Sequence, residues 1–241
     1  MSYKFDIDIN YFNKHNNLKL DAYPSLLSAV AYDHLKGTDQ GVGVVILDKY
    51  AWVLVSMKIE VVKPLDNLTV EGNTWFAGNR GPFYRREYLI LNEGEPFIKA
   101  ASYSVLLNMD TRTIYREKEL PFERLKEEKI HLVELLPSFK EEVQYKEVYQ
   151  SFVTNSMIDV FDHVNNIKYS ELAYNALSLD EIKNLSNLKE IELYFAKEML
   201  INHKFSVKKA KTVNKIYIQV YNNTTNTIAF TMVLTLKKEE I

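Results

Sequence analysis

The residues best suited to chemistry lie close together, between Asp159 and Tyr169. This stretch carries a carboxylate at Asp159 and an imidazole at His163. Two side-chain amides, at Asn165 and Asn166, come next, and an amphipathic segment follows them. We expect a strand that ends in the acid and the imidazole, and then a helix that begins at the amides. The backbone N–H groups and the positive dipole end at a helix N-terminus can stabilise a developing negative charge.

The composition is that of a globular protein without strong charge bias. The chain has 241 residues, of which 46% are apolar and 26% charged, enough for one large domain or two small ones. Its 30 Lys and Arg residues nearly balance 32 Asp and Glu residues, so bulk charge gives no reason to expect nucleic-acid binding. The absence of cysteine excludes disulfides, cysteine-ligated metals and a cysteine nucleophile, and it fits a reducing compartment.

No targeting, membrane-spanning or metal-binding pattern stands out in the sequence. The first residues, MSYKFDID, lack the apolar core of a signal peptide. No run reaches the roughly 20 apolar residues that span a bilayer. His131 and His203 have no partners at metal-ligand spacing. We therefore expect a cytoplasmic protein that does not insert into membranes and uses neither a metal nor another cofactor.

Period-two alternation of apolar residues dominates both halves of the chain and indicates strands with one buried face. In the first half it predicts strands over Trp52–Lys63, Thr69–Phe76, Tyr84–Leu91 and Phe97–Met109. In the second half it predicts strands over Ile191–Phe195, Ile216–Val220 and Phe230–Leu236. Strands of this length, so close in sequence, imply antiparallel sheets.

Two segments have the spacing of core helices. Pro24–Lys36 repeats apolar residues at helical spacing, with a proline suited to the first turn and a glycine after its end. Asn166–Leu177 carries a second apolar stripe. The charged stretch Glu117–Lys146 separates the halves, and we expect a short connecting helix around Glu127–Leu136. The chain thus predicts one α+β unit twice: an apolar helix followed by a long antiparallel sheet that could wrap it.

Several short motifs, taken in order, resemble one enzyme family. In the first half they are Ala51–Leu54, Thr74-Trp75, Arg85–Tyr88, Ala101-Ser102 and Asp110–Arg112. In the second half they are His163–Asn166 with Tyr169, and Leu193–Glu198. Their order and spacing are similar to those of the acyl-acyl carrier protein thioesterases, which are tandem hotdog domains. The resemblance implies an N-terminal hotdog over residues 1–122, a linker over 123–146 and a C-terminal hotdog with the catalytic residues over 147–241.

The catalytic motif of that family, Asp-x-Asn-x-His-Val-Asn-Asn with a later Glu, can be carried onto this chain residue by residue. The Asp falls on Asp159 and the His on His163, while the later Glu falls on Glu198. The first Asn of the motif falls on Phe161. Phenylalanine has no amide with which to donate or accept a hydrogen bond. The chain therefore departs from the family pattern at this position.

The resemblance implies hydrolysis of fatty acyl-acyl carrier protein, with release of free fatty acid and no covalent nucleophile. Asp159 or Glu198 would accept a proton from the attacking water, and His163 would orient water or protonate the leaving thiolate. The oxyanion would be stabilised at the start of the helix by backbone N–H groups around Val164, Asn165 and Asn166. The implied partner is acyl carrier protein, and the family also allows a homodimer.

Structural interpretations of the same residues stay open at this point. Asp159 can be a turn residue and Glu198 a solvated strand residue, while Asn165 and Asn166 suit N-caps. Tyr169 is expected in the core or in a pocket wall. Arg85-Arg86 is expected to form a solvated face or a salt bridge, with a carrier-protein contact as the alternative. Core positions are expected at Leu26, Leu27, Val30, Trp52 and Trp75, and some of these would line the acyl tunnel that the family has in its N-terminal hotdog.

Two functional alternatives to hydrolysis of acyl-acyl carrier protein stay open, and the second of them depends on Phe161. The chain can be an acyl-coenzyme A thioesterase, or a non-catalytic acyl-binding or carrier-binding protein that lost activity at this position. The ring itself can fill the space of the missing amide and exclude water, or it can pack in the core while Asp159 and His163 position water. In a shifted strand register, the Asp162 side chain would point inward and act as the base. This register is less consistent with the motif, because a shift of one residue would turn the Asp159 and His163 side chains away from the site.

Overall fold

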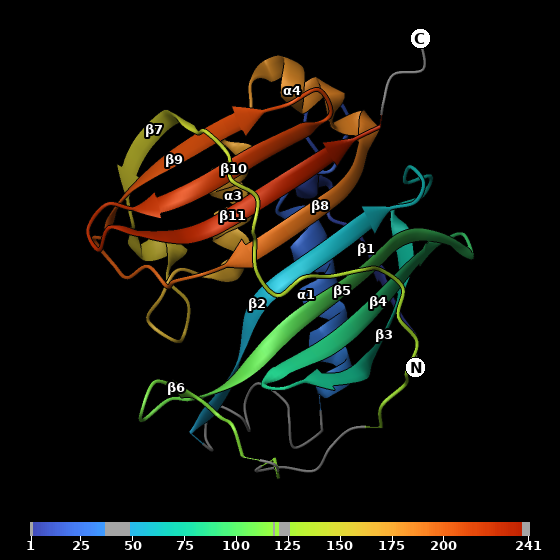
Figure 1. The fold of residues 1–241 in the computed structure, drawn as a ribbon. Helices are drawn as coiled ribbons and strands as arrows, with labels where there is room; N and C mark the ends of the chain where they lie inside the picture. Colours follow the sequence, from blue (N-terminus) through green and yellow to red (C-terminus); the bar gives the residue numbers. More distant parts are fainter. Residues whose placement is uncertain (1, 37–48, 118, 121–125, 238–241) are drawn as a thin grey trace. The chain divides into compact units, whose positions relative to one another are not determined.

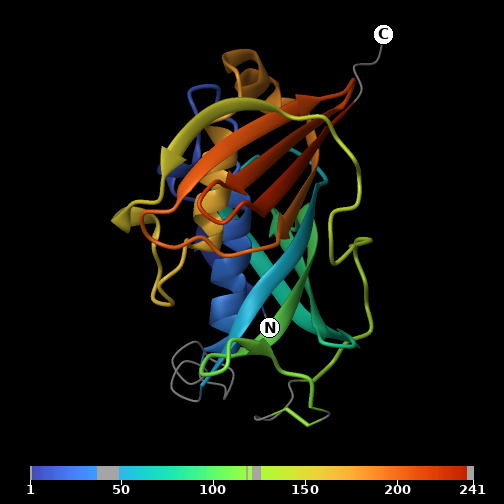
Figure 2. The ribbon, with the colours of Figure 1, turned by 60° about the vertical axis from the view of Figure 1, so that its left-hand side comes forward.

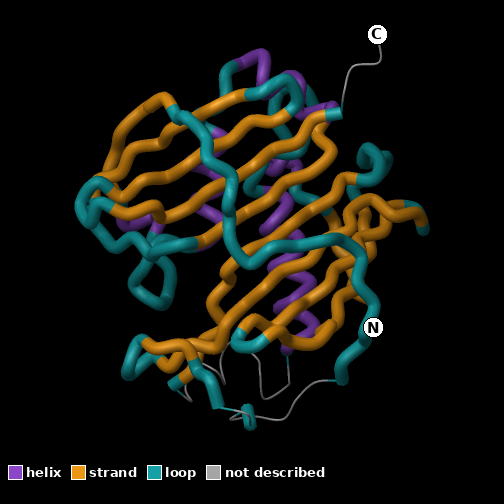
Figure 3. Tube along the Cα trace, in the orientation of Figure 1, coloured by secondary structure: helices purple, strands orange, loops and turns teal. Residues whose placement is uncertain are grey.

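The protein has two units, seen in a computed structural model that describes residues 2–36, 49–117, 119–120 and 126–237. The first unit comprises Met1–Ile7 and Leu26–Pro137, and the second comprises Asp8–Ser25 and Ser138–Ile241. In both units strands make up most of the regular structure (Figure 3). Within the described ranges, no helix is both long and apolar enough to cross a membrane. The predicted limits of the two hotdog domains stay a prediction.

One antiparallel sheet forms the body of the first unit (Figure 1). Its strands run in the order β1-β3-β4-β5-β2, and β6 pairs with β5. They are β1 (Ser2–Asp6), β2 (Tyr50–Val61), β3 (Thr69–Arg80), β4 (Phe83–Asn92), β5 (Glu95–Asn108) and β6 (Thr113–Ile114). The four strands predicted from alternation are confirmed as β2 to β5. Alternation did not predict β1, which is short and has no buried residue.

Helix α1 (Ala22–Leu35) lies against a face of this sheet, and its residues from Leu26 onward belong to the first unit (Figures 1 and 2). The packing is close enough to require a glycine in β3. A Cβ atom on Gly72 would lie 2.3 Å from Cγ2 of Val30, a separation that side chains cannot adopt. Leu26, Leu27 and Val30 are buried, which confirms the predicted core stripe of the helix.

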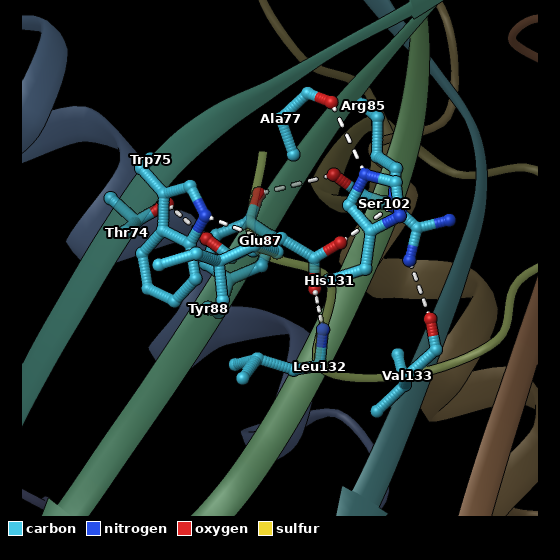
Figure 4. A network of polar contacts seen from close by, with 11 residues as sticks. Thr74, Trp75, Ala77, Arg85, Glu87, Tyr88, Ser102, His131, Leu132 and Val133 are labelled. Atoms are coloured by element: carbon cyan, nitrogen blue, oxygen red, sulfur yellow. Dashed lines mark hydrogen bonds and ion pairs between the residues drawn. The ribbon is translucent and has the colours of Figure 1, made fainter. Parts of the chain in front are cut away.

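The segment Lys126–Pro137, which we call the strap, is extended, so the predicted helix around Glu127–Leu136 is wrong. Side chains of the sheet bind its backbone, which removes the need for helical hydrogen bonds (Figure 4). Trp75 Nε1 donates to Ile130 O at 3.0 Å. The Glu87 carboxylate accepts the Leu132 N–H at 3.0 Å. These contacts place the Trp75 indole under the strap.

Arg85 and Arg86 are both buried, so the expected solvated face is wrong, whereas the expected salt bridge is present between Arg85 and Glu87. Arg85 donates to the buried Glu87 carboxylate and to the strap carbonyl of Val133. Arg86 has a guanidinium carbon 4.1 Å from the centroid of the Phe76 ring. Because both guanidinium groups are used inside the first unit, neither is a surface contact for a carrier protein.

The second unit also has one antiparallel sheet, in the order β8-β11-β10-β9-β7. Its strands are β7 (Lys146–Phe152), β8 (Leu188–Phe195), β9 (Lys204–Lys211), β10 (Lys215–Asn222) and β11 (Thr227–Leu236). Its helices are α3 (Asn166–Tyr174) and α4 (Leu179–Lys183), with 3-10 helices η1 (Ile9–Tyr11), η2 (Asn155–Met157) and η3 (Asn184–Asn187). The predicted strands β8, β10 and β11 are confirmed, and so is helix α3, which ends at Tyr174 instead of Leu177.

Helix α3 contacts β10 and β11, and its apolar side supplies the buried residues Tyr169 and Ala173. Alternation did not reveal β7 and β9. Strand β7 is an edge strand without a buried residue, and β9 ends in a lysine-rich run. Each unit therefore has a helix against an antiparallel sheet, which confirms the predicted α+β class and the hotdog arrangement.

Candidate active site

The Asp159–His163 segment is a tight loop, not the end of a strand as predicted. Strand β7 ends earlier, and η2 lies between it and the loop. An isolated antiparallel bridge joins Ile158 to Val164 at the base of the loop. The Asp159 N–H donates to His163 O at 3.0 Å. Asp162 closes the turn with a φ of 62°, a left-handed conformation that aspartate tolerates better than most residues.

This loop brings the Asp159 carboxylate beside the His163 imidazole. Asp159 Oδ1 lies 3.5 Å from His163 Nδ1, and each side chain is 19% exposed. Asp159 Oδ1 also accepts the Phe161 N–H at 2.9 Å. The pair is therefore held by its own loop and remains accessible to water or substrate. It can accept a proton at the carboxylate and donate one from the imidazole.

Phe161 does not pack in the core, which rules out one of the two interpretations of this residue. Its ring is half-buried and lies on the imidazole of His163, with centroids 5.8 Å apart and planes inclined by 19°. The missing amide is thus replaced by two different contacts. The backbone N–H of Phe161 binds Asp159, and its ring covers one face of His163.

Asn165 is the N-cap of helix α3, as predicted. Its side-chain Oδ1 accepts the Ile167 N–H at 2.9 Å, and its own N–H donates to Met157 O at 2.9 Å. The Val164 N–H donates to Met199 O at 2.9 Å. Of the three predicted oxyanion donors, Val164 and Asn165 are therefore excluded, because their N–H groups already have acceptors. Asn166 is the first residue of the helix, and in the described part of the chain its N–H has no acceptor.

Glu198 lies in the loop after β8, which corrects its expected place on a strand. This loop begins directly after β8, where the N–H groups of Ala196 and Lys197 both donate to Ala229 O. Glu198 itself is exposed. The next residue, Met199, is joined to the Asp159–His163 loop by the hydrogen bond from Val164. The structure therefore brings the loop of Glu198 next to the loop of Asp159 and His163.

Tyr169 also belongs to this neighbourhood, although the sequence suggested only a core or wall position. It is 3% exposed. Burial raises its pKa, the backbone of Met199 acts to lower it, and the charges of Glu198 and Asp159 raise it. Its position in the sequence could have indicated this place. Tyr169 comes four residues after the N-cap, and helical side chains lean toward the N-terminus of the helix.

The two histidines that lack partners at metal-ligand spacing in the sequence, His131 and His203, have structural contacts. His203 Nδ1 lies 2.9 Å from Asn222 Nδ2 and also accepts the Leu200 N–H at 3.3 Å. His131, which belongs to the strap, has its Nε2 3.3 Å from Ala77 O of β3. In the described ranges, no three His, Asp or Glu side chains are grouped as metal ligands.

Family models match both halves of the chain. The model of the acyl-ACP thioesterase N-terminal domain matches residues 1–120, and that of the C-terminal domain matches residues 140–240. The chain belongs to the acyl-ACP thioesterase family. This acyl-ACP thioesterase family member is thus a thioester hydrolase, and the loop that holds Asp159 and His163 lies in the part matched by the C-terminal model.

Solved structures share the fold of this family member. An acyl-ACP thioesterase from Bacteroides thetaiotaomicron is 18% identical with a TM-score of 0.81, over 98% of this chain and 97% of that one. A 12:0-ACP thioesterase from Umbellularia californica is 17% identical with a TM-score of 0.75, over 98% and 96%. A MaoC-like dehydratase from Phytophthora capsici has a TM-score of 0.59 at 11% identity, over 99% and 95%. The fold alone therefore does not decide the reaction. No curated protein matches the chain.

Proposed function

We propose that this protein hydrolyses the thioester between a fatty acyl chain and acyl carrier protein, and releases the free fatty acid in the cytoplasm. The observation that carries the proposal is the contact of Asp159 with His163, 3.5 Å apart and partly exposed, beside the start of helix α3. A carboxylate, an imidazole and a helix N-terminus are the groups that water-mediated acyl transfer needs. Membership of the family supports acyl carrier protein as the carrier.

In the proposed reaction Asp159 accepts a proton from water as the water oxygen attacks the thioester carbonyl. The Phe161 N–H and His163 both bind Oδ1 of this carboxylate, which leaves Oδ2 to face the water. As the tetrahedral intermediate collapses, the C–S bond breaks and His163 gives a proton to the thiolate. Asp159 returns the proton taken from water to His163, so the products are a carboxylic acid and a thiol.

The carbonyl oxygen gains negative charge during this attack, and the start of α3 is suited to stabilise it. The Asn166 N–H is the donor we assign to the oxyanion, because the N–H groups of Val164 and Asn165 already have acceptors. The positive end of the helix dipole adds to the stabilisation. Glu198 is the second carboxylate of the site, close enough for its charge to act on Tyr169 together with that of Asp159.

The acyl chain is proposed to lie in the first unit, against the apolar side of α1 formed by Leu26, Leu27 and Val30. We do not assign Trp75 to the acyl-binding site, because its indole N–H donates to the strap carbonyl of Ile130. We also propose a homodimer, which sedimentation of the purified chain would test. The domain limits at residues 122 and 147 can be tested by limited proteolysis.

The decisive experiment measures free fatty acid and free carrier thiol from acyl-acyl carrier proteins of several chain lengths, with the matching acyl-coenzyme A set as the comparison. Faster release from the carrier-protein set supports the proposal. Release from the coenzyme A set alone would favour the acyl-coenzyme A alternative. Asp159→Ala and Glu198→Ala should each lower turnover, and full activity in both variants would refute the residue assignment.

One observation favours a second candidate, a non-catalytic protein that binds acyl carrier protein. Phe161 stands where the family has an amide, so an amide-dependent step is absent from this site. In that case the purified protein would bind acyl carrier protein and release no acid. A gain of hydrolysis in Phe161→Asn would then identify the amide as the missing group.

A further inference from the structure

Arg86 of β4 is a buried cation whose contacts are all with neutral groups. It is 6% exposed and faces α1, whereas Arg85 and Glu87 on the other face of the strand bind the strap. Its Nη1 contacts His34 Nδ1 at 3.0 Å and Thr74 Oγ1 at 3.2 Å. A guanidinium can only donate, so His34 accepts here and carries its proton on Nε2. In the described ranges, no Asp or Glu forms an ion pair with Arg86.

The other terminal nitrogen of Arg86, Nη2, has hydrogen-bonding capacity to spare. It is buried, and within the part of the chain that the structure describes it has no hydrogen-bond acceptor. The Phe76 ring covers one face of the guanidinium, with its centroid 4.1 Å from the central carbon, so a ligand would bind at the edge, in the plane of the N–H groups. A buried donor without an acceptor destabilises the folded chain, and a charged donor does so more strongly. An acceptor that carries negative charge would satisfy the N–H groups and neutralise the cation.

This arginine lies at the end of the apolar wall on which the acyl chain is proposed to lie. His34 comes one helical turn after Val30, on the same side of α1. On β3, Gly72 closely approaches Val30, and Thr74, two residues later on the same face of the strand, binds Arg86. The wall that begins with apolar side chains therefore ends at a polar group.

The direction of α1 indicates which end of the acyl chain would reach this group. Ala22–Ser25 at the start of the helix belong to the second unit, which also contains the loop of Asp159. The helix then continues from Leu26 to His34, a length of about 12 Å at about 1.5 Å per residue. An acyl chain that lies along this stretch, with its thioester toward the start of the helix, has its far end at Arg86.

We propose that the acyl group preferred by this site carries a carboxylate at its far end, which binds the Nη2 edge of Arg86. This inference rests on the proposed function and names the class of acyl chain that it acts on. A methyl end would leave the buried guanidinium without an acceptor, whereas a carboxylate matches its planar donors. Arg86 is already desolvated in the folded chain, so only the carboxylate has to lose water on binding.

The kinetic test uses dicarboxylic acids joined to acyl carrier protein through one carboxyl group, with unsubstituted acyl chains of the same lengths as the comparison. At the best length, kcat/KM should be at least about tenfold higher for the carboxylate-ended chain. A hydroxyl-ended chain should lie between the two, because it accepts a hydrogen bond without neutralising the charge. Equal or faster hydrolysis of the unsubstituted chain at every length would overturn the inference and leave the proposed hydrolysis intact. A preference for the hydroxyl-ended chain would refute the anionic class.

Arg86→Met is the decisive variant, because it removes the charge and keeps an unbranched side chain. The ratio of kcat/KM for carboxylate-ended to unsubstituted chains should fall about ten- to hundredfold. Arg80→Met is the matched control, since Arg80 is exposed at the end of β3 in the same sheet, and its ratio should equal that of the wild type. An unchanged ratio in Arg86→Met, or the same decrease in both variants, would refute the inference.

A binding measurement on the wild type does not depend on turnover, and it stands even if Arg86→Met does not fold. Monoamides of straight-chain dicarboxylic acids carry a charge at one end only, and fatty amides of the same length are the neutral comparison. The monoamides should raise the melting temperature more than the fatty amides do, and this difference should be absent from a folded Arg86→Met variant. No difference in the wild type would overturn the inference. A protein that shows the difference but hydrolyses no acyl thioester would refute the proposed function alone.

Discussion

The aromatic ring of Phe161 lies on the imidazole of His163, with centroids 5.8 Å apart and planes 19° from parallel. The same residue donates its backbone N–H to Asp159 at 2.9 Å. Phe161 therefore contacts both members of the carboxylate–imidazole pair. Any residue except proline has the N–H, so only the ring contact depends on phenylalanine. Phe161, where the chain departs from the family pattern, therefore supports the His163 side chain by stacking on its ring.

Replacing Phe161 by alanine should lower kcat about three- to tenfold, because a ring contact of this kind is worth roughly 0.5–1.5 kcal/mol and its loss leaves the imidazole less ordered. Steady-state hydrolysis assays measure the effect. Val160→Ala is the control, since Val160 is in the same loop and 79% exposed. Phe161→Asn should not exceed the wild type, because it gains an amide and loses the ring. A faster Asn variant would show that the amide matters more than the stack.

Asp159→Asn should lower kcat by about 10²-fold, because it removes the base while its side-chain oxygen can still accept the Phe161 N–H. The melting temperature should stay close to that of the wild type. Asp162→Asn in the same loop is the matched comparison, since asparagine also tolerates the φ of 62° found there. We expect near-normal turnover in that variant. The reverse pattern would make Asp162 the base.

Asn165→Ala should destabilise the protein by about 1 kcal/mol, because the Ile167 N–H loses its cap. Urea denaturation followed by circular dichroism measures the loss. Asn165→Ser retains a capping oxygen and should recover most of the stability. Equal stability of the Ala and Ser variants would mean that the cap contributes little, and the start of α3 would then have another support.

His34 should make the protein less stable in mild acid. Burial, and then the charge of Arg86 with its Nη1 3.0 Å from Nδ1, lowers the pKa of His34 from 6.5 to about 4. Between these values the unfolded chain binds a proton that the folded chain does not, so the free energy of unfolding falls as the pH falls through this window. Denaturant midpoints measured from pH 7 to 4 would show the decrease, and His34→Gln should reduce it. His15→Gln, in an exposed loop, should behave as the wild type does.

The sequence was sufficient for elements whose signal is local. Strands β2 to β5 and β8, β10 and β11 carry apolar residues at alternate positions along much of their length, so the period of these residues revealed them. Helix α1 carries an apolar stripe, and the cap at Asn165 depends on neighbours two residues away. The apolar pattern did not reveal strand β7, because this strand has no buried residue. Such a strand exists only through its pairing with β9, which lies far along the chain.

By itself, then, the sequence determined the family, the α+β class, the pair of Asp159 with His163 and the helix that follows them. Only the tertiary structure decided which polar groups, in that stretch and in β4, remain available for catalysis or binding. The Val164 N–H is taken by Met199 O, which comes from another loop, and the Arg85 and Glu87 side chains are taken by the strap. The physical reason is that a hydrogen bond between residues distant in sequence leaves no periodic trace in either segment, yet it removes a donor or a charge from the chemistry that the local pattern suggests.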